Sequence, residues 1–546
     1  MQTEFYFNIF FAAIYSVIFF ILLLIKDKLR YLKFFILFII ILFCVYHQFL
    51  FNTDAEDAYI AYRYVHQFID GNGLVFNIGE RVEGYSDFLW IIIISATSKL
   101  GIEIPIAGRL LGLFFSILTV LFSYYLGKLL NKGSENSGLI TAYLVSVFGI
   151  FACYGLSGLE VPLFSFFILS ILYCCVKQKW LLSGLITSLA IMTHPDGILI
   201  AIGVAVFILL SKAVVSFKLK AMAFSLLGFL ILFLPWTIWR IEYYGYLLPN
   251  AMAAKKGLPF ALELKHGKNY LFSFFRMYWP ISLLLFGAAL VFFRSLFMKK
   301  SKISPELGFL SIILILNILF VLFVGGDWMP QWRFISPFAP VIILLIVYFI
   351  PDNVKNNTGS IISNVIILTI SFIGLLIFTI SFKFNGIPRV RIWTNSTNGL
   401  KFIGKWFHNT LPPKTCIAVF CNGALSYYDE LPTIDMLGLT DEHISRFGHK
   451  ALKGAPGHVS FDYEYVVNKH PAIIAFLGGS GFQKSTDPNL NKDPVFAQYA
   501  NISYIYEKSN NPCGKYINLL ILKRDKAAIT NYLSSQKEMI LIKDDQ

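Results

Sequence analysis

Long apolar runs alternate with short polar segments through the first 381 residues of the chain. About 20 apolar residues cross the hydrocarbon core of a bilayer, and shorter runs are tolerated inside a bundle of helices. Runs of this kind fall at residues 5–25, 34–51, 107–127, 138–153, 161–176, 181–193, 197–211, 220–240, 270–292, 307–325, 338–350 and 361–381. The pattern predicts an α-helical polytopic membrane bundle of roughly 12 transmembrane helices.

Lys and Arg gather in alternate loops between these runs, which indicates how the chain is oriented. The basic loops are residues 26–30, 128–132, 177–179, 212–220 and 294–302. Because short cytoplasmic loops carry the excess of positive charge, we expect these loops in the cytoplasm. The other loops, and everything after residue 382, then face the periplasm or cell exterior from a cytoplasmic (inner) membrane. This holds only if the short apolar run 89–100 is interfacial or re-entrant and does not cross.

Composition agrees with this picture and excludes one class of partner. Hydrophobic residues make up 56% of the 546 and charged residues 14%, and the mean hydropathy is +0.65. The net charge of +14 is largely explained by the basic loops that anchor the helices, so it does not indicate a nucleic-acid partner. The first apolar run has no basic segment before it, and we expect it to be a retained helix and not a cleaved signal.

After residue 382 the pattern changes to that of a soluble domain. Strand-like runs at residues 416–420, 472–476 and 519–522 alternate with polar helical stretches. They predict an extracytoplasmic α/β domain over residues 382–546, which follows a transmembrane catalytic domain over residues 1–381.

Three of the seven cysteines, Cys416, Cys421 and Cys513, lie in this exported domain. An oxidising location permits a disulfide between Cys513 and either Cys416 or Cys421. None of the cysteine spacings in the chain is that of a zinc site.

The first outer loop, residues 52–88, is a long polar segment with acids that a membrane helix would not hold. Ile60, Tyr64 and Phe68 fall on one stripe at a spacing of four, which predicts a helix at the start of the loop. The glycines of Gly71-Asn72-Gly73 are expected to end it.

Acids at the start of that helix are candidates for chemistry. With Asp54 as the N-cap, Asp57 falls in the first turn, where the helix dipole favours an ionised carboxylate. A carboxylate kept charged beside a bilayer can accept a proton. The plain alternative is that Asp54, Glu56 and Asp57 are only the solvated start of a helix.

The other outer loops break helices with small residues or prolines, and each carries charged or aromatic groups. The candidates are Glu160, His194, Asp196, Arg240, Lys255, Lys256, Asp327, Trp328 and Arg333. Because polar residues at the membrane boundary are costly, their gathering on one face predicts a shared cavity. Alternatives stay open: Glu160 as a helix cap, His194 as a structural loop residue, and Arg240 as a cation that snorkels in an aromatic belt.

Transfer of a sugar from a lipid phosphate to a hydroxyl needs the groups that these loops supply. A base deprotonates or orients the acceptor, and cations stabilise the departing phosphate. Glycoside hydrolysis would normally use two carboxylates that face the scissile bond. The sequence has no Gly-rich loop of the nucleotide-binding kind, so a donor used outside the cell is expected to be lipid-linked.

A set of ordered motifs runs through nearly the whole chain. They are Asp57-Ala58-Tyr59-Ile60 with Arg63-Tyr64, Gly71 to Asn77, Gly79 to Tyr85 with Glu83, Phe88-Leu89-Trp90, Gly158-Leu159-Glu160, His194-Pro195-Asp196-Gly197, Leu248-Pro249-Asn250, Gly325-Gly326-Asp327 with Arg333, and Asp435 to Asp441. In this order they resemble the terminal arabinofuranosyltransferase family of mycobacterial cell-wall synthesis. That family belongs to the GT-C class of integral membrane glycosyltransferases, which take sugars from polyprenyl-phosphate carriers.

The resemblance implies a GT-C-like fold for the membrane domain and a catalytic carboxylate at Asp57. Glu56 stands where the family often has a second Asp, and His194 and Asp196 stand where an Arg and a Glu are expected. Because the chain is rich in Lys, Asn, Ile and Phe, unlike a GC-rich mycobacterial protein, the acceptor need not be arabinan.

We therefore predict an enzyme that moves a pentofuranose, with arabinofuranose favoured, from polyprenyl phosphate to a hydroxyl of an envelope glycan or exported protein. Asp57 is the predicted catalytic residue: a general base if the anomeric configuration inverts, or a nucleophile or stabiliser of an ion pair if it is retained, and the sequence leaves both open. Residues expected to support it or to bind sugar and acceptor are Asp54, Glu56, Tyr59, Arg63, Glu83, Glu160, Asp196, Asp327 and Trp328. Residues expected to bind the donor phosphate are His194, Arg240, Lys255, Lys256 and Arg333. No cofactor or metal site is predicted, although a divalent ion held by Asp57 and a neighbouring acid is compatible with the chemistry.

Two alternatives to this function stay open. The donor could carry another sugar, such as a hexose or aminoarabinose, on the same carrier. The chain could also be a transporter or flippase of lipid-linked sugars, which would place polar residues near the bilayer midplane in paired repeats. Asp435 and Asp441 are expected near the membrane-facing cleft, with a role as plain turn residues the equal alternative.

Overall fold

The computed structural model describes residues 2–25, 31–297, 303–350, 361–383, 385–453, 457–476, 481–487, 489–509, 511, 514–536 and 538–544. The basic loop at 26–30, part of the loop at 294–302, and Cys513 lie outside these residues. The chain divides into two compact units. The first unit is Met1–Thr53, Arg109–Thr237 and Phe260–Val390, and the second is Asp54–Gly108, Ile238–Pro259 and Arg391–Gln546.

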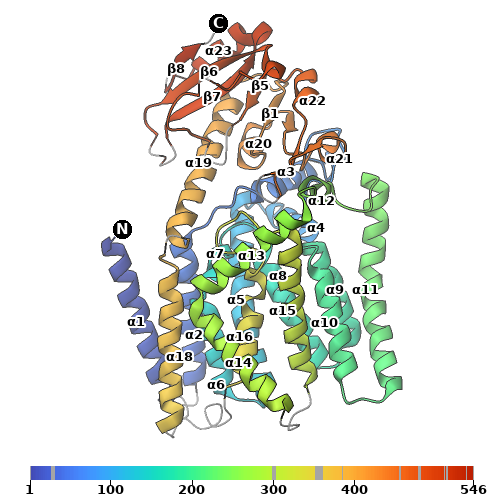
Figure 1. The fold of residues 1–546 in the computed structure, drawn as a ribbon, viewed down its shortest axis with the longest axis vertical. Coiled ribbons are helices and arrows are strands. Elements are labelled where there is room, and N and C mark those ends of the chain that lie inside the picture. The colour runs from blue at the N-terminus through green and yellow to red at the C-terminus, as the bar shows by residue number, and fades with distance from the viewer. Residues whose placement is uncertain are drawn as a thin grey trace. The chain divides into compact units, whose positions relative to one another are not determined.

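The described part of the first unit is helical, and its helices run alongside one another in Figure 1. They are α1 (Gln2–Ile25), α2 (Leu32–Phe51), α5 (Ile104–Leu130), α6 (Glu135–Val147), α7 (Gly149–Tyr154), α8 (Val161–Val176), α9 (Trp180–Thr193), α10 (Gly197–Leu210), α11 (Val215–Tyr244), α13 (Phe260–Met277), α14 (Trp279–Phe297), α15 (Pro305–Val324), α16 (Ala339–Tyr348) and α18 (Ile361–Ile380). Helices α5 and α11 continue into the second unit. Every predicted apolar run falls on one or more of these helices.

The expected number of roughly 12 spans is not confirmed by helix length and composition. Within the described residues, six helices are long and apolar enough to cross a membrane, or up to seven if one bent pair is a single span. The bent pair corrects the prediction of one helix over 270–292, because α13 and α14 meet at 96°. Pro280 explains the break, since proline has no N–H to donate and its ring disfavours continuation of the preceding helix.

Local sequence explains where α15 begins and ends. The Ser304 hydroxyl accepts a hydrogen bond from the Leu307 N–H at 3.2 Å, and Pro305 occupies the first turn, where its missing N–H costs nothing. At the other end Gly325 has φ +82°, the left-handed conformation that glycine adopts without strain. The helix therefore spans the full apolar run at 307–325.

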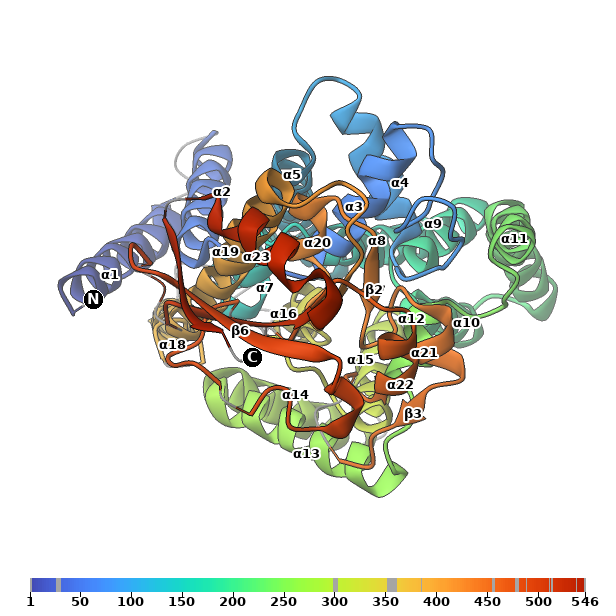
Figure 2. The same ribbon diagram turned by 90° about the horizontal axis from the view of Figure 1, so that it is seen from above.

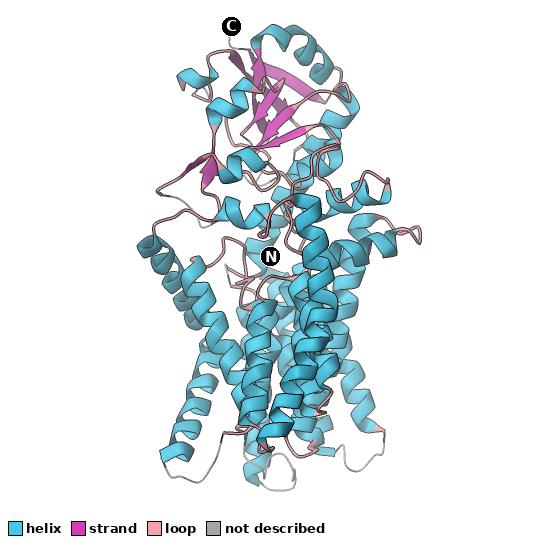
Figure 3. Ribbon diagram, turned by 90° about the vertical axis from the view of Figure 1, so that its right-hand side faces the viewer, coloured by secondary structure: helices cyan, strands magenta, loops and turns pink. Residues whose placement is uncertain are grey.

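The second unit contains all the strands of the described chain, which Figure 3 shows in magenta. Its helices are α3 (Ala58–Ile69), α4 (Phe88–Ser98), α12 (Asn250–Lys255), α19 (Ile387–Thr410, mostly in this unit), α20 (Ala424–Asp429), α21 (Glu442–Arg446), α22 (Tyr463–Asn468) and α23 (Lys526–Ser534). Its strands are β1 (Ile417–Val419), β2 (Thr433–Asp435), β3 (His449–Lys450), β4 (Ser460–Phe461), β5 (Ile473–Ala475), β6 (Tyr499–Tyr506), β7 (Tyr516–Leu522) and β8 (Met539–Asp544). The predicted strands at 416–420, 472–476 and 519–522 are confirmed as β1, β5 and β7.

The main sheet has the strand order β2-β1-β5-β7-β6-β8 and is mixed. Strand β1 pairs in parallel with β2 and β5, whereas β5–β7, β7–β6 and β6–β8 are antiparallel. Strands β3 and β4 form a separate antiparallel pair that lies near α21 in Figure 2. The core under the sheet includes Ala418, Met436, Ile474 and Leu520, all almost fully buried.

Helix α3 begins later than the sequence predicted. Its N-cap is Asp57 and not Asp54, and the cap makes no side-chain hydrogen bond to the helix. Asp54 is instead held outside the helix, because its carboxylate pairs with Lys401 and its N–H donates to Thr394. The predicted stop is confirmed, since the helix ends at Ile69 ahead of the Gly-Asn-Gly turn.

Arg63, which the sequence predicts to support catalysis or to bind sugar or acceptor, is only 4% exposed. Its guanidinium donates to the carbonyl oxygens of Phe76 at 2.9 Å, Ser426 at 2.5 Å and Leu431 at 2.7 Å. The Asp429 carboxylate lies 3.8 Å away and balances the charge. Burial of a cation is costly unless each donor has a partner, so this fork ties α3 to the chain around α20.

We predict that Arg63→Lys destabilises the protein by about 3 kcal/mol, because lysine cannot reproduce the planar fork and leaves buried carbonyls without donors. Arg524→Lys, at an exposed arginine, is the matched control and should change stability by less than ~0.5 kcal/mol. Thermal unfolding in detergent, followed by reaction of the buried cysteines with a thiol-reactive fluorophore, measures both. Equal midpoints for the two variants would contradict the role given to Arg63.

Candidate active site

A group of acids gathers at the start of α3. Asp57 is half-buried and Glu56 is buried. The Glu56 Oε1 accepts hydrogen bonds from the N–H groups of Gly423 at 2.6 Å and Ala424 at 3.2 Å. Gly423 is required there, since a Cβ on it would lie 2.2 Å from the Glu56 carbonyl oxygen. The Glu56 side chain is thus fixed by the backbone before α20.

Electrostatics add Asp435 and Cys421 to this acidic group. The pKa of Glu56 is raised to about 8, mainly by burial, then by the neighbouring Asp57 and least by Asp435, while the hydrogen bonds from Gly423 and Ala424 oppose the rise. Burial and the charges of Glu56, Asp57 and Asp435 likewise raise the pKa of the Cys421 thiol well above its usual value. A carboxyl that keeps its proton to about pH 8 therefore stands next to a second, half-buried carboxyl, which is an arrangement suited to acid–base chemistry.

Asp435 is itself firmly positioned. Its carboxylate accepts hydrogen bonds from the N–H groups of Leu437 at 3.0 Å and Thr440 at 2.8 Å. Burial raises its pKa, and these two hydrogen bonds oppose the rise. Asp441 caps α21 by accepting from the Ile444 N–H at 3.0 Å, so it has the structural role that the sequence left open.

Lys401 is a member of the site that sequence reasoning missed. It extends from α19 to pair with Asp54, and its ammonium lies 4.9 Å from the centre of the Tyr59 ring. The Tyr59 hydroxyl donates to the other Asp54 oxygen at 3.1 Å. Asp54, three residues before Asp57, therefore has a fixed position. No motif marks Lys401, which occurs in a polar helix with one other lysine, Lys405.

Glu83 and Arg240 form a buried ion pair, with the carboxylate 3.1 Å from the guanidinium Nε. Arg240 also donates to the Leu247 carbonyl. Burial raises the pKa of Glu83 to about 8, and the charge of Arg240 opposes this rise. Beside the pair, the hydroxyls of Tyr85 and Tyr244 are hydrogen-bonded at 3.0 Å. The sequence selected Glu83 and Arg240 separately, and the structure joins them.

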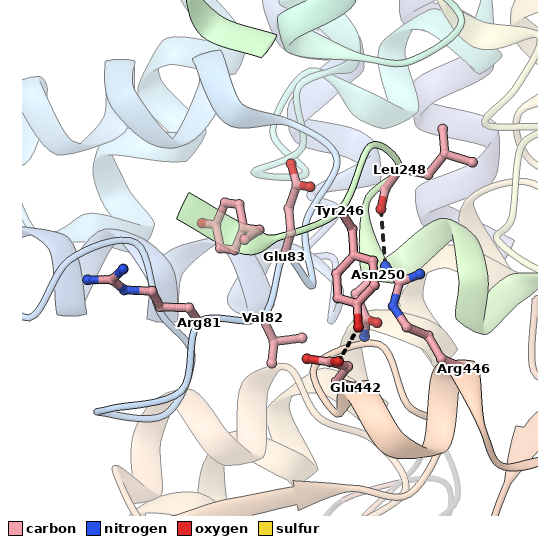
Figure 4. Close-up of a pocket in the computed structure, with 9 residues that line it drawn as sticks. Arg81, Val82, Glu83, Tyr246, Leu248, Asn250, Glu442 and Arg446 are labelled. Atoms are coloured by element: carbon pink, nitrogen blue, oxygen red, sulfur yellow. Dashed lines mark hydrogen bonds between the residues drawn. The ribbon is translucent and has the colours of Figure 1, made fainter. Parts of the chain in front are cut away.

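A small cavity of about 10 Å³ lies next to this pair, with room for about one water molecule. It is lined by Arg81, Val82, Glu83, Tyr244, Tyr246, Leu248, Asn250, Glu442 and Arg446. Figure 4 shows Tyr246 donating to Glu442 at 2.5 Å and Arg446 donating to the Leu248 carbonyl at 3.3 Å. The Arg446 guanidinium also stacks on the Tyr246 ring at 3.5 Å. With room for about one water molecule, the cavity is too small to hold a sugar.

A second set of predicted residues lies in the first unit. The His194 ring lies 3.8 Å from the Glu160 carboxylate and 3.4 Å from that of Asp196, and it stacks on Phe164. Burial raises the pKa of Asp196 to about 7; the charge of Arg333 opposes this and that of Glu160 adds to it. The turn between α9 and α10 and the start of α8 thus bring an imidazole between two buried acids.

Arg333 completes this set after the end of α15. Its guanidinium Nε lies 2.7 Å from the Asp327 carboxylate, which also accepts from the Trp328 N–H at 2.9 Å. Gly325 and Gly326 both have positive φ and let the chain turn sharply here. Asp327, Trp328 and Arg333 are therefore held close together, as their spacing suggested.

The predicted residues therefore fall into two groups. Glu160, His194, Asp196, Asp327, Trp328 and Arg333 belong to the first unit, and Asp54, Glu56, Asp57, Tyr59, Arg63, Glu83, Arg240, Lys255 and Lys256 belong to the second. Lys255 and Lys256, at the end of α12, are exposed. Arg63 has a structural role.

The sequence left open a divalent ion held by Asp57 and a neighbouring acid, and a disulfide between Cys513 and either Cys416 or Cys421. Within the described chain, no group of three His, Cys, Asp or Glu side chains is arranged to hold a metal ion. Cys416 and Cys421 carry free thiols, and their predicted partner Cys513 lies outside the described residues.

Comparison with solved structures identifies the class of fold. The chain has the fold of ArnT from Cupriavidus metallidurans, a GT-C glycosyltransferase. The structure of that protein bound to undecaprenyl phosphate matches with a TM-score of 0.53 at 12% identity over 80% of this chain and 92% of ArnT. The apo structure matches with a TM-score of 0.56 at 12% identity over 88% and 98%. The GT-C-like fold is therefore confirmed.

Comparison by sequence matches only a part of the chain. Residues 391–519 match a family model described as "Domain of unknown function (DUF8728)". No curated protein matches the chain. The match covers most of the mixed sheet and α19 to α22, so this part of the second unit recurs in other proteins.

The raised pKa of Glu56 predicts a pH dependence of stability. The folded protein keeps this proton up to about pH 8, whereas the unfolded chain releases it near 4.5. The folded state therefore binds more protons between these values, and its stability falls as the pH rises through that window. Glu56→Gln keeps the acceptor oxygen for Gly423 but cannot ionise, so it should lose less stability than wild type between about pH 6 and about pH 9.

Thermal unfolding at the two pH values measures this difference. Glu464→Gln, at an exposed acid in the first turn of α22, is the control and should follow wild type. If Glu56→Gln lost as much stability as wild type, the proton would not reside on Glu56.

Proposed function

We propose that the chain is an integral membrane glycosyltransferase that transfers a sugar from a polyprenyl-phosphate donor to an acceptor hydroxyl. The main support is the likeness in fold to ArnT over 80–88% of this chain, since one of those structures holds undecaprenyl phosphate. The long apolar helices support a multi-pass membrane protein. The acidic group at the start of α3 supplies the chemistry that such a transfer needs.

In this proposal Asp57 is the catalytic carboxylate. The acceptor hydroxyl oxygen forms a bond to the anomeric carbon while the bond from that carbon to the phosphate oxygen breaks. Asp57 takes the hydroxyl proton, and the bonding electrons leave with the polyprenyl phosphate, a good leaving group that needs little help from an acid. Asp57 is half-buried whereas Glu56 and Asp435 are buried, so among these three acids the Asp57 carboxylate is the most accessible to an acceptor.

Glu56 acts in this proposal through its protonated state. Burial gives it a pKa of about 8, so near neutral pH it adds no second negative charge beside Asp57. Two adjacent charged carboxylates would repel each other and resist ionisation of either one. The neutral form of Glu56 therefore adds no like-charge repulsion to the site, and Lys401 fixes the neighbouring Asp54.

The donor phosphate needs a cation that it can reach. Arg240 is buried against Glu83, and Arg333 is paired with Asp327. Lys255 and Lys256 are exposed and belong to the same unit as Asp57, which favours them for this role. Arg333 and His194, in the first unit, are separate candidates for phosphate contact.

We extend the proposal to the donor sugar and the acceptor. The ordered motifs favour arabinofuranose, and the likeness to ArnT is equally compatible with aminoarabinose. A hydroxyl of an envelope glycan or of an exported protein is the expected acceptor. We place the chain in the cytoplasmic membrane with Asp57 on the outer side, because the basic loops alternate with the acidic ones along the sequence.

The first test is sugar transfer by the purified chain in detergent, with an envelope extract as acceptor. Radiolabelled polyprenyl-phosphate arabinofuranose, aminoarabinose and a hexose are offered in separate reactions. Asp57→Asn keeps the shape of the side chain and removes the proton acceptor, so transfer should fall by 10²–10⁴-fold while donor binding is kept. Asp70→Asn, at an exposed acid directly after α3, is the matched control and should retain transfer.

Two results would count against this function. Equal transfer by Asp57→Asn and wild type would remove Asp57 from the chemistry. Movement of labelled donor across a vesicle membrane without transfer to any acceptor would favour a flippase over an enzyme.

The phosphate assignment makes a separate prediction. The double variant Lys255→Gln, Lys256→Gln should raise the KM for donor by about 10-fold and change kcat by less than about 2-fold, because two ground-state contacts to phosphate are lost. Lys414→Gln, at another exposed lysine of the second unit, should leave both constants unchanged. Steady-state kinetics with varied donor measure the difference; an unchanged KM in the double variant would direct attention to Arg333.

A further inference from the structure

Two adjoining cavities lie at one end of the first unit, beside the turn that joins α8 to α9. Their volumes are about 720 and 630 Å³. Both are lined by Gln178, Trp180 and Phe217, so they are two lobes of one groove, which we call the α9–α11 groove. The larger lobe continues past Phe207 to the start of α15.

The groove lies at the opposite end of α8 and α9 from the first unit's acidic residues. Glu160 precedes α8, and His194 follows α9, whereas Gln178 and Trp180 lie at the other ends of these helices. A helix of 16 residues, such as α8, is about 24 Å long. Within the first unit, the groove is therefore separate from Glu160 and His194.

Helices α9 and α11 pack closely beside the groove. A Cβ on Gly184 would lie 1.9 Å from the Ser225 carbonyl oxygen, and one on Gly228 would lie 2.1 Å from that of Leu181. Only glycines allow α9 and α11 to approach so closely. The larger side chains Trp180 and Phe217 follow at the ends of the same helices, with ring centres 6.4 Å apart, and line both lobes.

The groove is open to the apolar surroundings of the bundle. Only 11% of the most apolar 18-residue stretch of α11 is buried. The side chains of Leu181, Leu182 and Phe224, which line the smaller lobe, are 39–42% exposed. Figures 1 and 2 show α9, α10 and α11 side by side at one side of the bundle. In a membrane, acyl chains would cover these side chains.

The charged lining of the groove is basic. Lys179 and Lys220 line the smaller lobe, and Lys212 lines the larger one. One acid, Glu306, lies in the larger lobe, so the three lysines leave a net charge of +2. All three lysines are exposed, and their ammonium groups can reach a ligand.

We propose that the α9–α11 groove binds an anionic phospholipid of the bilayer. The headgroup phosphate lies against Lys179 and Lys220 in the smaller lobe, with Lys212 nearby in the larger lobe. The parts of the acyl chains next to the headgroup lie over Trp180, Phe217 and Phe224. Basic pockets between membrane helices bind anionic headgroups in this way, with a gain of roughly fivefold in affinity per lysine. A soluble anion would make no use of the apolar lining, and a zwitterionic lipid would gain less from the lysines.

Native mass spectrometry of the full-length, delipidated chain in detergent tests this proposal. Phosphatidylglycerol and phosphatidylcholine are titrated separately, and the bound lipid is counted. Wild type should bind phosphatidylglycerol at least about 5-fold more tightly than phosphatidylcholine. Lys179→Gln with Lys220→Gln should remove about 25-fold of the phosphatidylglycerol affinity, by the same fivefold per lysine, and leave phosphatidylcholine unchanged.

Lys177→Gln is the matched control, because Lys177 is an exposed lysine of the same turn that lines neither lobe. It should change phosphatidylglycerol binding by less than about 2-fold. Lys212→Gln, as a third variant, should give an intermediate loss. Equal binding of the two lipids by wild type, an equal loss in Lys177→Gln, or displacement of the lipid by inorganic phosphate would each overturn the proposal.

Discussion

Burial of charge in the first outer loop is the constraint on which the second unit depends. Glu56, Arg63 and Glu83 are each less than 9% exposed, within a segment that would be a solvated loop on its own. A buried ion is tolerated only with a partner or hydrogen bonds. Each of the three finds these far along the chain, at Gly423, Asp429 and Arg240. The same contacts that neutralise the charges therefore determine the position of α3.

The parts of the fold that depend on local pattern could be predicted from the sequence. Apolar runs long enough for helices are visible directly, and short buried strands such as β1 and β5 stand out by their β-branched residues. The sharp bend between α13 and α14 was missed because the apolar run continues through it. Pro280 was the available signal, and its effect depends on how the neighbouring helices accommodate the break.

Residues of the candidate site could be predicted from their type and position, but which of them pair with one another could not. Polar residues at helix ends are conspicuous in an apolar sequence and indicated Arg240, His194 and Asp196, whereas Glu83 was indicated by the motifs of the family resemblance. That Glu83 pairs with Arg240 depends on contacts between segments more than 150 residues apart, which no single sequence reports. Lys401 was missed for the same reason: a lysine in a polar helix has many ordinary uses.

The wide separation of these partners also has a consequence for biosynthesis. Arg63 and Ser426 are 363 positions apart. At 5–20 residues per second, the ribosome needs roughly 20–70 s to reach the second after the first. During that time the first outer loop has its charges but not their partners, so it must stay hydrated or be held by another factor. The segment nearest the proposed chemistry is thus among the first to be translated and among the last to acquire its native structure.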